Sequence, residues 1–392
     1  MEMGLPLAGK LQGIMNKASR YDVAIIGGGL AGLSAAILLA RLDYRVILFE
    51  KESYPYHKVC GEYISMESWD FLKRLGVPLD EMKLPIIRNL ELTAPNGRVF
   101  KTTLPLGGFG ISRYTLDQQL ARLAEDSGAT LVQNTRVDGV SFNNEFEITA
   151  GNQAFNAAVC LGAFGKRSNL DVKWSRGFLQ AYDRKLDNFV AVKYHISATW
   201  PADTIGLHNF KNGYCGISKI ENGLYCLCYL TRSSELKKWG NQVKLLEEKS
   251  LANNPHLKKI FSEAIVEKEF PITISQVSFN KKKQVENHIL MLGDAAGMIA
   301  PLCGNGMSIA MHTGKIAAEL SAAFLKGKIS REQMERKYTK QWEHHFASRL
   351  RTGRILQKFF GKQWLSNLFV QTFRSVPLLA KPLIKMTHGK PF

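Results

Sequence analysis

Two glycine-rich segments, far apart in the chain, carry the residues from which ligand chemistry can be predicted. In the first, Gly27, Gly29 and Gly32 have the spacing Gly-x-Gly-x-x-Gly, and Glu50 follows about 20 residues later. These glycines permit a tight turn, close approach to a pyrophosphate and close packing of a helix on a strand. The helix would offer free N–H groups to the phosphates, and Glu50 would accept hydrogen bonds from ribose hydroxyls. The segment predicts a dinucleotide site.

The second segment, 293–307, suits the opposite end of such a ligand. Asp294 offers a short carboxylate for a ribityl hydroxyl, and Pro301 fixes the direction of the chain. Gly304 and Gly306 let the backbone approach a flat ring, and a helix expected from Met307 aims its positive end at that ring. Reduced flavin is anionic at its N1–C2=O edge, so this geometry favours the reduced form. Together the two segments predict FAD held at both ends.

Strand and helix patterns occur where these segments need them. Asp22–Ile26 is predicted to be a buried strand, Leu30–Arg41 a helix and Arg45–Phe49 a second strand, which makes a βαβ unit. Ile289–Leu292 is a short apolar strand directly before the second segment. Residues 175–280 have the alternation typical of another sheet. The chain therefore predicts an α/β fold, with a Rossmann-like FAD-binding domain, an inserted mixed-sheet substrate domain and a helical C-terminal tail.

This order sets the expected domain boundaries. The FAD-binding domain is expected in three segments, because the substrate domain interrupts it twice. Residues 1–20 form a leader that is either helical or unstructured. The expected segments are 21–85, 109–172 and 286–330 for the FAD-binding domain, 86–108 and 173–285 for the substrate domain, and 331–392 for a basic helical C-terminal region.

Composition limits the classes of protein to which the chain can belong. Its 392 residues are enough for about two domains, and 45% hydrophobic with 22% charged residues is ordinary for a globular protein. No apolar run reaches the roughly 20 residues of a membrane span, and the N-terminal stretch lacks the apolar block of a secretory signal. The six cysteines form no CxxC pair, and no HExxH pattern occurs. We expect a cytoplasmic protein without a metal site.

The C-terminal tail is strongly basic. The formal net charge is +18, and the nine Lys and Arg residues after Glu343 are accompanied by no acidic residue. Such a tail could meet nucleic acid, an anionic membrane surface or an acidic substrate. Gln357–Phe373 has near-helical apolar spacing, which fits either a membrane-surface helix or a helix packed on the protein with a solvated basic face. No RNA-binding module is recognisable, so a membrane surface is the candidate partner and no nucleic acid is expected.

The motifs resemble one known family. Gly27–Gly32, the stretch Ile111-Ser112-Arg113, and Gly293–Met307 resemble the glutathione-reductase-type FAD proteins of the para-hydroxybenzoate hydroxylase fold. The resemblance extends over about residues 20–330 and is strongest in the motifs. The geranylgeranyl reductase family is the most similar branch, since aromatic hydroxylases usually have His at the position of Gly297.

The resemblance implies further site residues. Arg113 matches an arginine that lies along FAD, and Val137 matches a strand whose backbone meets the adenine. Cys60 matches a cysteine near the flavin and is the candidate catalytic residue, while Tyr214 is the candidate substrate-binding residue. The full set expected to bind FAD is Gly27, Gly29, Ala31, Gly32, Glu50, Lys51, Cys60, Gly61, Arg113, Val137, Asp294, Pro301, Gly304, Gly306 and Met307.

Three positions depart from the family pattern. Phe164 stands where hydroxylases have the Asp of a Gly-Ala-Asp-Gly motif linked to FAD and NAD(P)H, so the electron donor is either NAD(P)H or a separate reductase or ferredoxin. Glu62 replaces a glycine of the cysteine loop. Only Tyr214 remains of a Tyr-x-Trp-x-Phe-Pro stretch, so the polyprenyl pocket of that family does not carry over.

These observations predict an FAD-dependent oxidoreductase. Its expected reaction is reduction of double bonds in a hydrophobic, lipid-like or polyketide-like substrate by hydride transfer from flavin N5. An alternative on the same fold is a monooxygenase that uses a C4a-hydroperoxide. A lesser alternative is an FAD-containing protein whose basic face associates with RNA.

Overall fold

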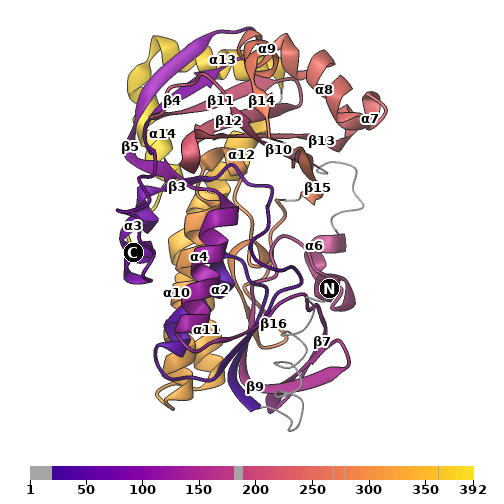
Figure 1. The fold of residues 1–392 in the computed structure, drawn as a ribbon, viewed down its shortest axis with the longest axis vertical. Coiled ribbons are helices and arrows are strands. Elements are labelled where there is room, and N and C mark those ends of the chain that lie inside the picture. The colour runs from indigo at the N-terminus through magenta and orange to yellow at the C-terminus, as the bar shows by residue number, and fades with distance from the viewer. Residues whose placement is uncertain (1–19, 181–188, 268, 278, 361) are drawn as a thin grey trace, which may run out of the picture.

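The computed structural model describes residues 20–180, 189–267, 269–277, 279–360 and 362–392. The predicted leader therefore lies, except for Arg20, outside the described residues. The described chain forms two lobes, each built around one sheet, with long helices running between them (Figure 1). The predicted fold class is confirmed in its three parts, namely a parallel-sheet domain, a second mixed sheet and a helical C-terminal region. The exact domain boundaries stay a prediction.

The first sheet has a parallel centre made of short apolar strands. Its order is β16-β17-β9-β1-β2-β6, and β8 joins β9 to β7. Val23, Ala24 and Ile25 of β1 have no exposed surface, as expected for a strand covered on both faces. Its strands are β1 Arg20–Ile26, β2 Val46–Phe49, β6 Thr130–Val132, β7 Val137–Asn143, β8 Glu145–Ala150, β9 Gln153–Gly162, β16 Val285–Glu286 and β17 Ile289–Met291.

The second sheet is mostly antiparallel and makes up the other lobe. Its order is β14-β10-β13-β12-β11-β4-β5-β3, with β15 also paired to β10. It collects strands that lie before and after β6–β9 in the chain. Its strands are β3 Tyr63–Ser65, β4 Ile86–Thr93, β5 Val99–Gly110, β10 Phe189–Ser197, β11 Thr204–Phe210, β12 Gly213–Lys219, β13 Tyr225–Arg232, β14 Ile265–Val266 and β15 Ile272–Val277.

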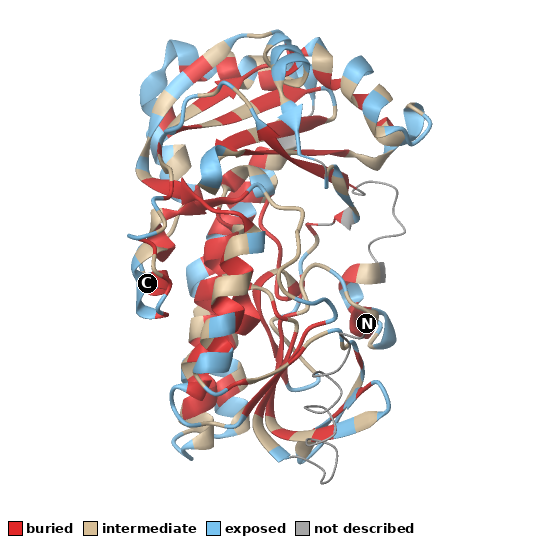
Figure 2. Cartoon of the chain, viewed as in Figure 1, coloured by how far each residue is buried: buried red, intermediate tan, exposed pale blue. Residues whose placement is uncertain are grey.

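Helices cover both sheets, and two of them pack unusually closely. A side chain at Gly314 would place its Cβ 2.5 Å from the carbonyl oxygen of Ala31, so α10 can lie directly on α2 only because this residue is glycine. Figure 2 shows the buried residues concentrated along these two helices and inside the sheets. The helices are α2 Leu30–Ala40, α3 Trp69–Arg74, α4 Arg113–Asp126, α5 Asn169–Lys173, α6 Gly177–Gln180, α7 Ser233–Lys238, α8 Val243–Lys249, α9 Pro255–Glu263, α10 Gly306–Leu325, α11 Arg331–Trp342, α12 Ser348–Phe359, α13 Gln363–Ser375 and α14 Ala380–Thr387.

The C-terminal helices pack on the second sheet. Val370 and Phe373 of α13 and Ala380 of α14 form one buried cluster with Leu92 of β4 and Phe100 of β5. Part of the apolar face predicted for this tail therefore meets the protein. Other apolar side chains of the same region stay largely exposed to solvent, namely Ile355, Trp364, Leu368, Val376, Leu378, Leu379 and Met386.

Candidate functional site

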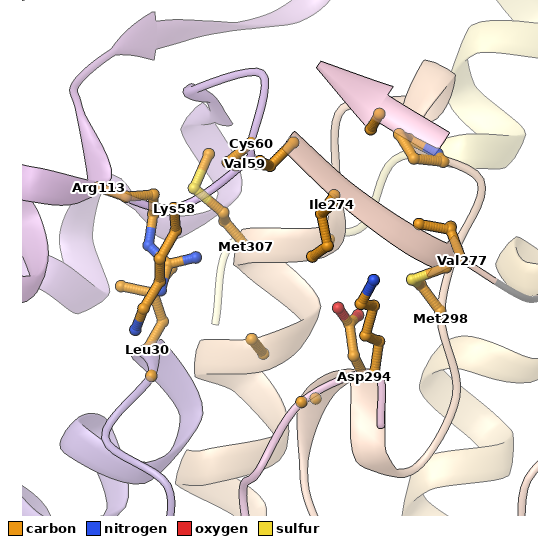
Figure 3. A pocket seen from close by; sticks show the side chains of 18 of the residues that line it. Leu30, Lys58, Val59, Cys60, Arg113, Ile274, Val277, Asp294, Met298 and Met307 are labelled. Carbon is orange, nitrogen blue, oxygen red and sulfur yellow. The ribbon is translucent and has the colours of Figure 1, made fainter. Parts of the chain in front are cut away.

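One cavity of about 960 Å³ runs between the two lobes. Its wall begins at the β1–α2 turn and reaches the strands of the second sheet (Figure 3). Of the residues predicted to touch cofactor or substrate, only Gly32 lies behind the wall. The cavity brings together Gly27, Gly29, Ala31, Glu50, Lys51, Cys60, Gly61, Arg113, Val137, Tyr214, Asp294, Pro301, Gly304, Gly306 and Met307.

The first end of the cavity is the β1–α2 turn. Gly27 has φ +104°, and a Cβ there would lie 2.5 Å from the carbonyl oxygen of Ala163. The carboxylate of Glu50 is buried, and its two oxygens accept hydrogen bonds from the backbone N–H of Gly28 at 2.8 Å and of Glu52 at 3.1 Å. Each oxygen has a second lone pair, so the carboxylate can also accept from ribose hydroxyls. This end fits the adenosine half of FAD.

Glu50 yields the first test. Glu50→Gln should weaken FAD binding about 10- to 100-fold, because a hydrogen bond to a charged group contributes about 1.5–3 kcal/mol and the amide group cannot accept at both positions. The measurement is the Kd of FAD from quenching of its fluorescence by the apoprotein. Glu125→Gln, on the exposed face of α4, is the matched control and should bind FAD like the parent. Equal affinity of both variants would contradict the ribose role.

The middle of the cavity wall is an ion cluster. The Arg113 guanidinium donates to both oxygens of Asp117, at 2.7 and 2.8 Å, and Lys58 Nζ lies 2.8 Å from the same carboxylate. Burial would raise the pKa of Asp117, but Arg113 and Lys58 outweigh it and hold the pKa below its usual range. Two cations against one buried anion leave a surplus positive charge facing the cavity. A pyrophosphate placed there would balance it.

The second end is built by the loop before α10. Gly304 has φ +67°, and a Cβ there would meet the ring of Tyr63 at 2.9 Å. The N-terminus of α10 follows at Gly306, with its free N–H groups near the cavity. Burial raises the pKa of Asp294, although Lys282, Arg113 and Lys166 act against this. Desolvation in turn lowers the pKa of Lys166 and of Lys282 to about 8. This end fits the ribityl chain and ring of a flavin.

Cys60 and Tyr214 lie where the cavity meets the second sheet. Burial raises the pKa of the Cys60 thiol, so the structure favours a thiol there rather than a reactive thiolate. Tyr214 is buried and packs edge-on against Phe360, with ring centroids 5.8 Å apart. Both residues are thus at the wall, and their roles stay predictions.

Sequence reasoning missed the charged groups around this wall. Asp117 follows Arg113 by four residues, a spacing that pairs opposite charges on a helix, so this partner had a readable signal. Lys193 and His195 alternate in β10 and share one face, and two polar residues on one face of a buried strand are also a signal. His57, Lys58 and Lys166 lie in irregular segments, where spacing carries no such information.

Comparison with known proteins agrees with the geometry. A family profile described as "FAD binding domain" matches residues 20–350. "Conditioned medium factor receptor 1" of Dictyostelium discoideum is 26% identical, with 87% of this chain and 72% of that protein covered. A digeranylgeranylglycerophospholipid reductase of Methanocaldococcus jannaschii is 25% identical, with 86% and 87% covered.

A solved structure shows the same fold. The flavin-dependent brominase Bmp2 superposes with a TM-score of 0.77 at 19% identity, over 94% of this chain and 93% of that one. The predicted resemblance and the predicted cofactor are confirmed by the family match. This chain belongs to the FAD binding domain family, and it is an FAD-dependent oxidoreductase.

Proposed function

We propose that this enzyme reduces carbon–carbon double bonds in a long apolar lipid. The observation that carries the proposal is the apolar lining of the cavity beyond the flavin end, contributed by β11, β12, β13 and β15. These side chains include Leu207, Ile217, Leu230, Ile274 and Val277. Such a wall suits hydrocarbon, and the described residues of β11, β12, β13 and β15 that line the cavity include no charged side chain. The name of the archaeal relative, a digeranylgeranylglycerophospholipid reductase, supports the same substrate class.

A second, smaller cavity extends the apolar space. It has a volume of about 100 Å³ and lies beneath α12, α13 and α14. It shares Tyr63, Gly304, Ile205 and Leu207 with the wall of the main cavity. A chain longer than the main cavity could therefore continue beneath the C-terminal helices.

This arrangement suggests separate roles for the cofactor and for the residues of the chain. FAD bound in the cavity would supply a hydride from its reduced ring. Arg113 and Lys58 would hold its pyrophosphate, and Glu50 would hold its adenosine ribose. Asp294 and the N-terminus of α10 would orient the ring at the other end. The apolar wall keeps water away from the reacting carbon atoms.

The electron donor is proposed to be a separate reducing protein. Phe164 lies in the cavity wall and packs against Trp174, with ring centroids 6.2 Å apart. It offers no carboxylate at the place where resembling hydroxylases have one for NAD(P)H handling. Stopped-flow mixing with NADPH and with reduced ferredoxin tests this, and rapid flavin bleaching by NADPH alone would contradict it.

The reaction can be tested with one probe. Photoreduced enzyme is mixed anaerobically with digeranylgeranylglycerophospholipid, and the product is analysed by mass spectrometry. We expect reoxidation of the flavin and a gain of two hydrogens per double bond reduced. A parallel reaction under ¹⁸O₂ tests the monooxygenase alternative. Product that contains labelled oxygen, with no anaerobic turnover, would overturn the reductase proposal.

We also propose that the C-terminal face meets an anionic membrane surface. Leu378 is 83% and Trp364 is 66% exposed, and basic residues lie among such side chains on α13 and α14. Buried apolar area and attraction to anionic lipid would act together there. Among the described residues, no helix is long and apolar enough to cross a bilayer.

Charge reversal on α14 tests the membrane proposal. The double variant Lys381→Glu/Lys385→Glu should bind phosphatidylserine vesicles at least about 30-fold more weakly, since each basic side chain near such a surface contributes about 1 kcal/mol. Vesicle co-sedimentation measures the partitioning. The control, Lys326→Glu/Lys328→Glu, makes the same charge change on two exposed residues beyond the end of α10. Equal losses in both double variants would show that net charge, rather than this face, controls binding.

A further inference from the structure

Three titratable side chains meet at the cavity wall, and none of them has a role in the proposed reaction as described so far. Glu62 lines the cavity, and Lys193 and His195 reach it from β10. Glu62 and Lys193 have no exposed surface, and His195 is 4% exposed. The Lys193 ammonium pairs with Glu62 Oε1, and His195 Nε2 lies 2.6 Å from Glu62 Oε2. Both carboxylate oxygens are thus engaged in the interior.

Glu62 adopts a backbone conformation that is unfavourable for its residue type. Its φ is +55°, and this left-handed region costs an L-residue about 1 kcal/mol or more. The resembling cysteine loop has glycine at this position, which would avoid that cost. The carboxylate therefore has a role that offsets both the strain and the burial of charge.

Charged, titratable or hydrogen-bonding groups reach the surroundings of the carboxylate from β10, β13, the start of α4 and the Cys60 loop. From β10 come Lys193 and His195, and from β13 comes Cys226, whose thiol donates to the Cys60 carbonyl at 3.2 Å. The backbone N–H of Arg113 donates to Glu62 Oε1 at 2.8 Å. The loop itself adds the Lys58 carbonyl, which accepts from Lys193 at 3.2 Å, and the cavity-lining His57, Lys58 and Cys60.

These neighbours define the resting protonation. Burial would raise the pKa of Glu62, but Lys193 and His195 reverse this, so the pKa lies below its usual range. An ionised carboxylate only accepts hydrogen bonds, so Nε2 of His195 must carry the shared proton.

His57 lies between this cluster and an exposed carboxylate. The His57 ring lies edge-on to the His195 ring, with centroids 5.1 Å apart. His57 Nε2 is 3.1 Å from the carboxylate of Glu269, which is 75% exposed. His195, His57 and Glu269 thus form a series of neighbouring titratable side chains between Glu62 and the surface.

We infer that Glu62, Lys193 and His195 form a redox-linked proton site that takes up one proton when the flavin is reduced and releases it during reduction of the double bond. The inference rests on the proposed function for its second half only. Flavin bound in the cavity would take up two electrons and one proton on reduction, and the cluster of Glu62, Lys193 and His195 would take up one further proton. On reoxidation the flavin would supply a hydride to one alkene carbon while the π electron pair moves to the other carbon, and that carbon would receive the proton held by the cluster. The two electrons and both protons are then accounted for in the two new C–H bonds.

Counting protons tests the first half without any substrate. The FAD-loaded protein is photoreduced anaerobically at pH 8 in weak buffer with a pH-indicator dye, and proton uptake per flavin is measured. We expect about two protons for the parent and about one for Glu62→Gln and for His195→Gln. Tyr194→Phe, on the same strand but bonded to Glu247 instead, should behave like the parent. Retained FAD and an unchanged thermal midpoint identify the folded variants.

Several outcomes would overturn the inference. The parent could take up only one proton, or both variants could still take up two. Stoichiometric zinc in the purified protein would also overturn the inference, because a metal ion would then occupy the cluster. Glu62, His195 and Cys226 offer ligand atoms within 4.8 Å of one another. Two protons in the parent without turnover of the lipid probe would instead leave the proton site standing and reject the proposed substrate.

Discussion

Gly32→Val should keep the protein from folding around FAD, whereas Gly29→Val should fold like the parent and fail to retain FAD. The two glycines belong to one motif but face different surroundings. A Cβ at Gly32 would lie 2.1 Å from the carbonyl oxygen of Gly27 and 3.2 Å from Ile25 Cγ2, inside the β1–α2 packing. Neither neighbour can move without shifting the strand. We expect a loss of about 3 kcal/mol or more in the free energy of unfolding.

Gly29, unlike Gly32, has free space where a side chain would begin. A Cβ there would meet only Arg113 Nη2, at 3.9 Å, and the residue faces the cavity. A β-carbon therefore meets no obstacle in the apoprotein, and we expect the valine side chain to extend into the space predicted for the pyrophosphate. FAD affinity should fall at least about 100-fold. Urea unfolding of the apoprotein and FAD content after gel filtration separate the two effects. Gly177→Ala, where a Cβ meets nothing within 4 Å, is the control. Normal FAD content in Gly29→Val would contradict the prediction that the pyrophosphate lies at this turn.

The residues predicted to bind the adenosine half of FAD could be grouped from the sequence because they are close together in it. The Gly27 turn, the α2 N-terminus and Glu50 lie within one βαβ unit, and each is required by backbone geometry or by a ribose. Asp294 and Gly304 are equally local to the loop before α10. For these residues, type and spacing determine what the chain can do, and the structure places them in one cavity.

The other half of the wall depends on contacts that no local pattern encodes. Glu62 pairs with Lys193, 131 residues away, and only the docking of β10 against the Cys60 loop brings them together. The basic tail is similar. Its periodicity predicts helices, but whether Phe373 meets lipid or Phe100 depends on the second sheet beneath it. Long-range packing decides these contacts, so sequence reasoning left them open.

The second large effect is expected at Asp117. Asp117→Asn should lower the free energy of unfolding of the apoprotein by about 3–5 kcal/mol, because it leaves Arg113 and Lys58 side by side at the cavity wall without their buried, shared anion. Bound FAD should reduce this loss, since its pyrophosphate is predicted to lie against the same two cations. Urea unfolding is measured with and without saturating FAD. An equal loss under both conditions would contradict a pyrophosphate beside Arg113.

The pH dependence of Asp117 gives a second readout of the same cluster. The pKa of its carboxyl is lower in the folded protein than in the unfolded chain, so the stability it contributes is present at neutral pH. That stability is lost as the pH falls through the folded pKa. The parent apoprotein should therefore lose more stability than Asp117→Asn on acidification, and the two unfolding curves should converge. Asp80, the exposed partner of Lys73, supplies the control. Asp80→Asn should leave the loss of unfolding free energy between neutral and acidic pH almost the same as in the parent. Parallel losses in the parent and in Asp117→Asn would mean that Arg113 and Lys58 are balanced by another group, and that the surplus positive charge assigned to the cavity wall does not exist.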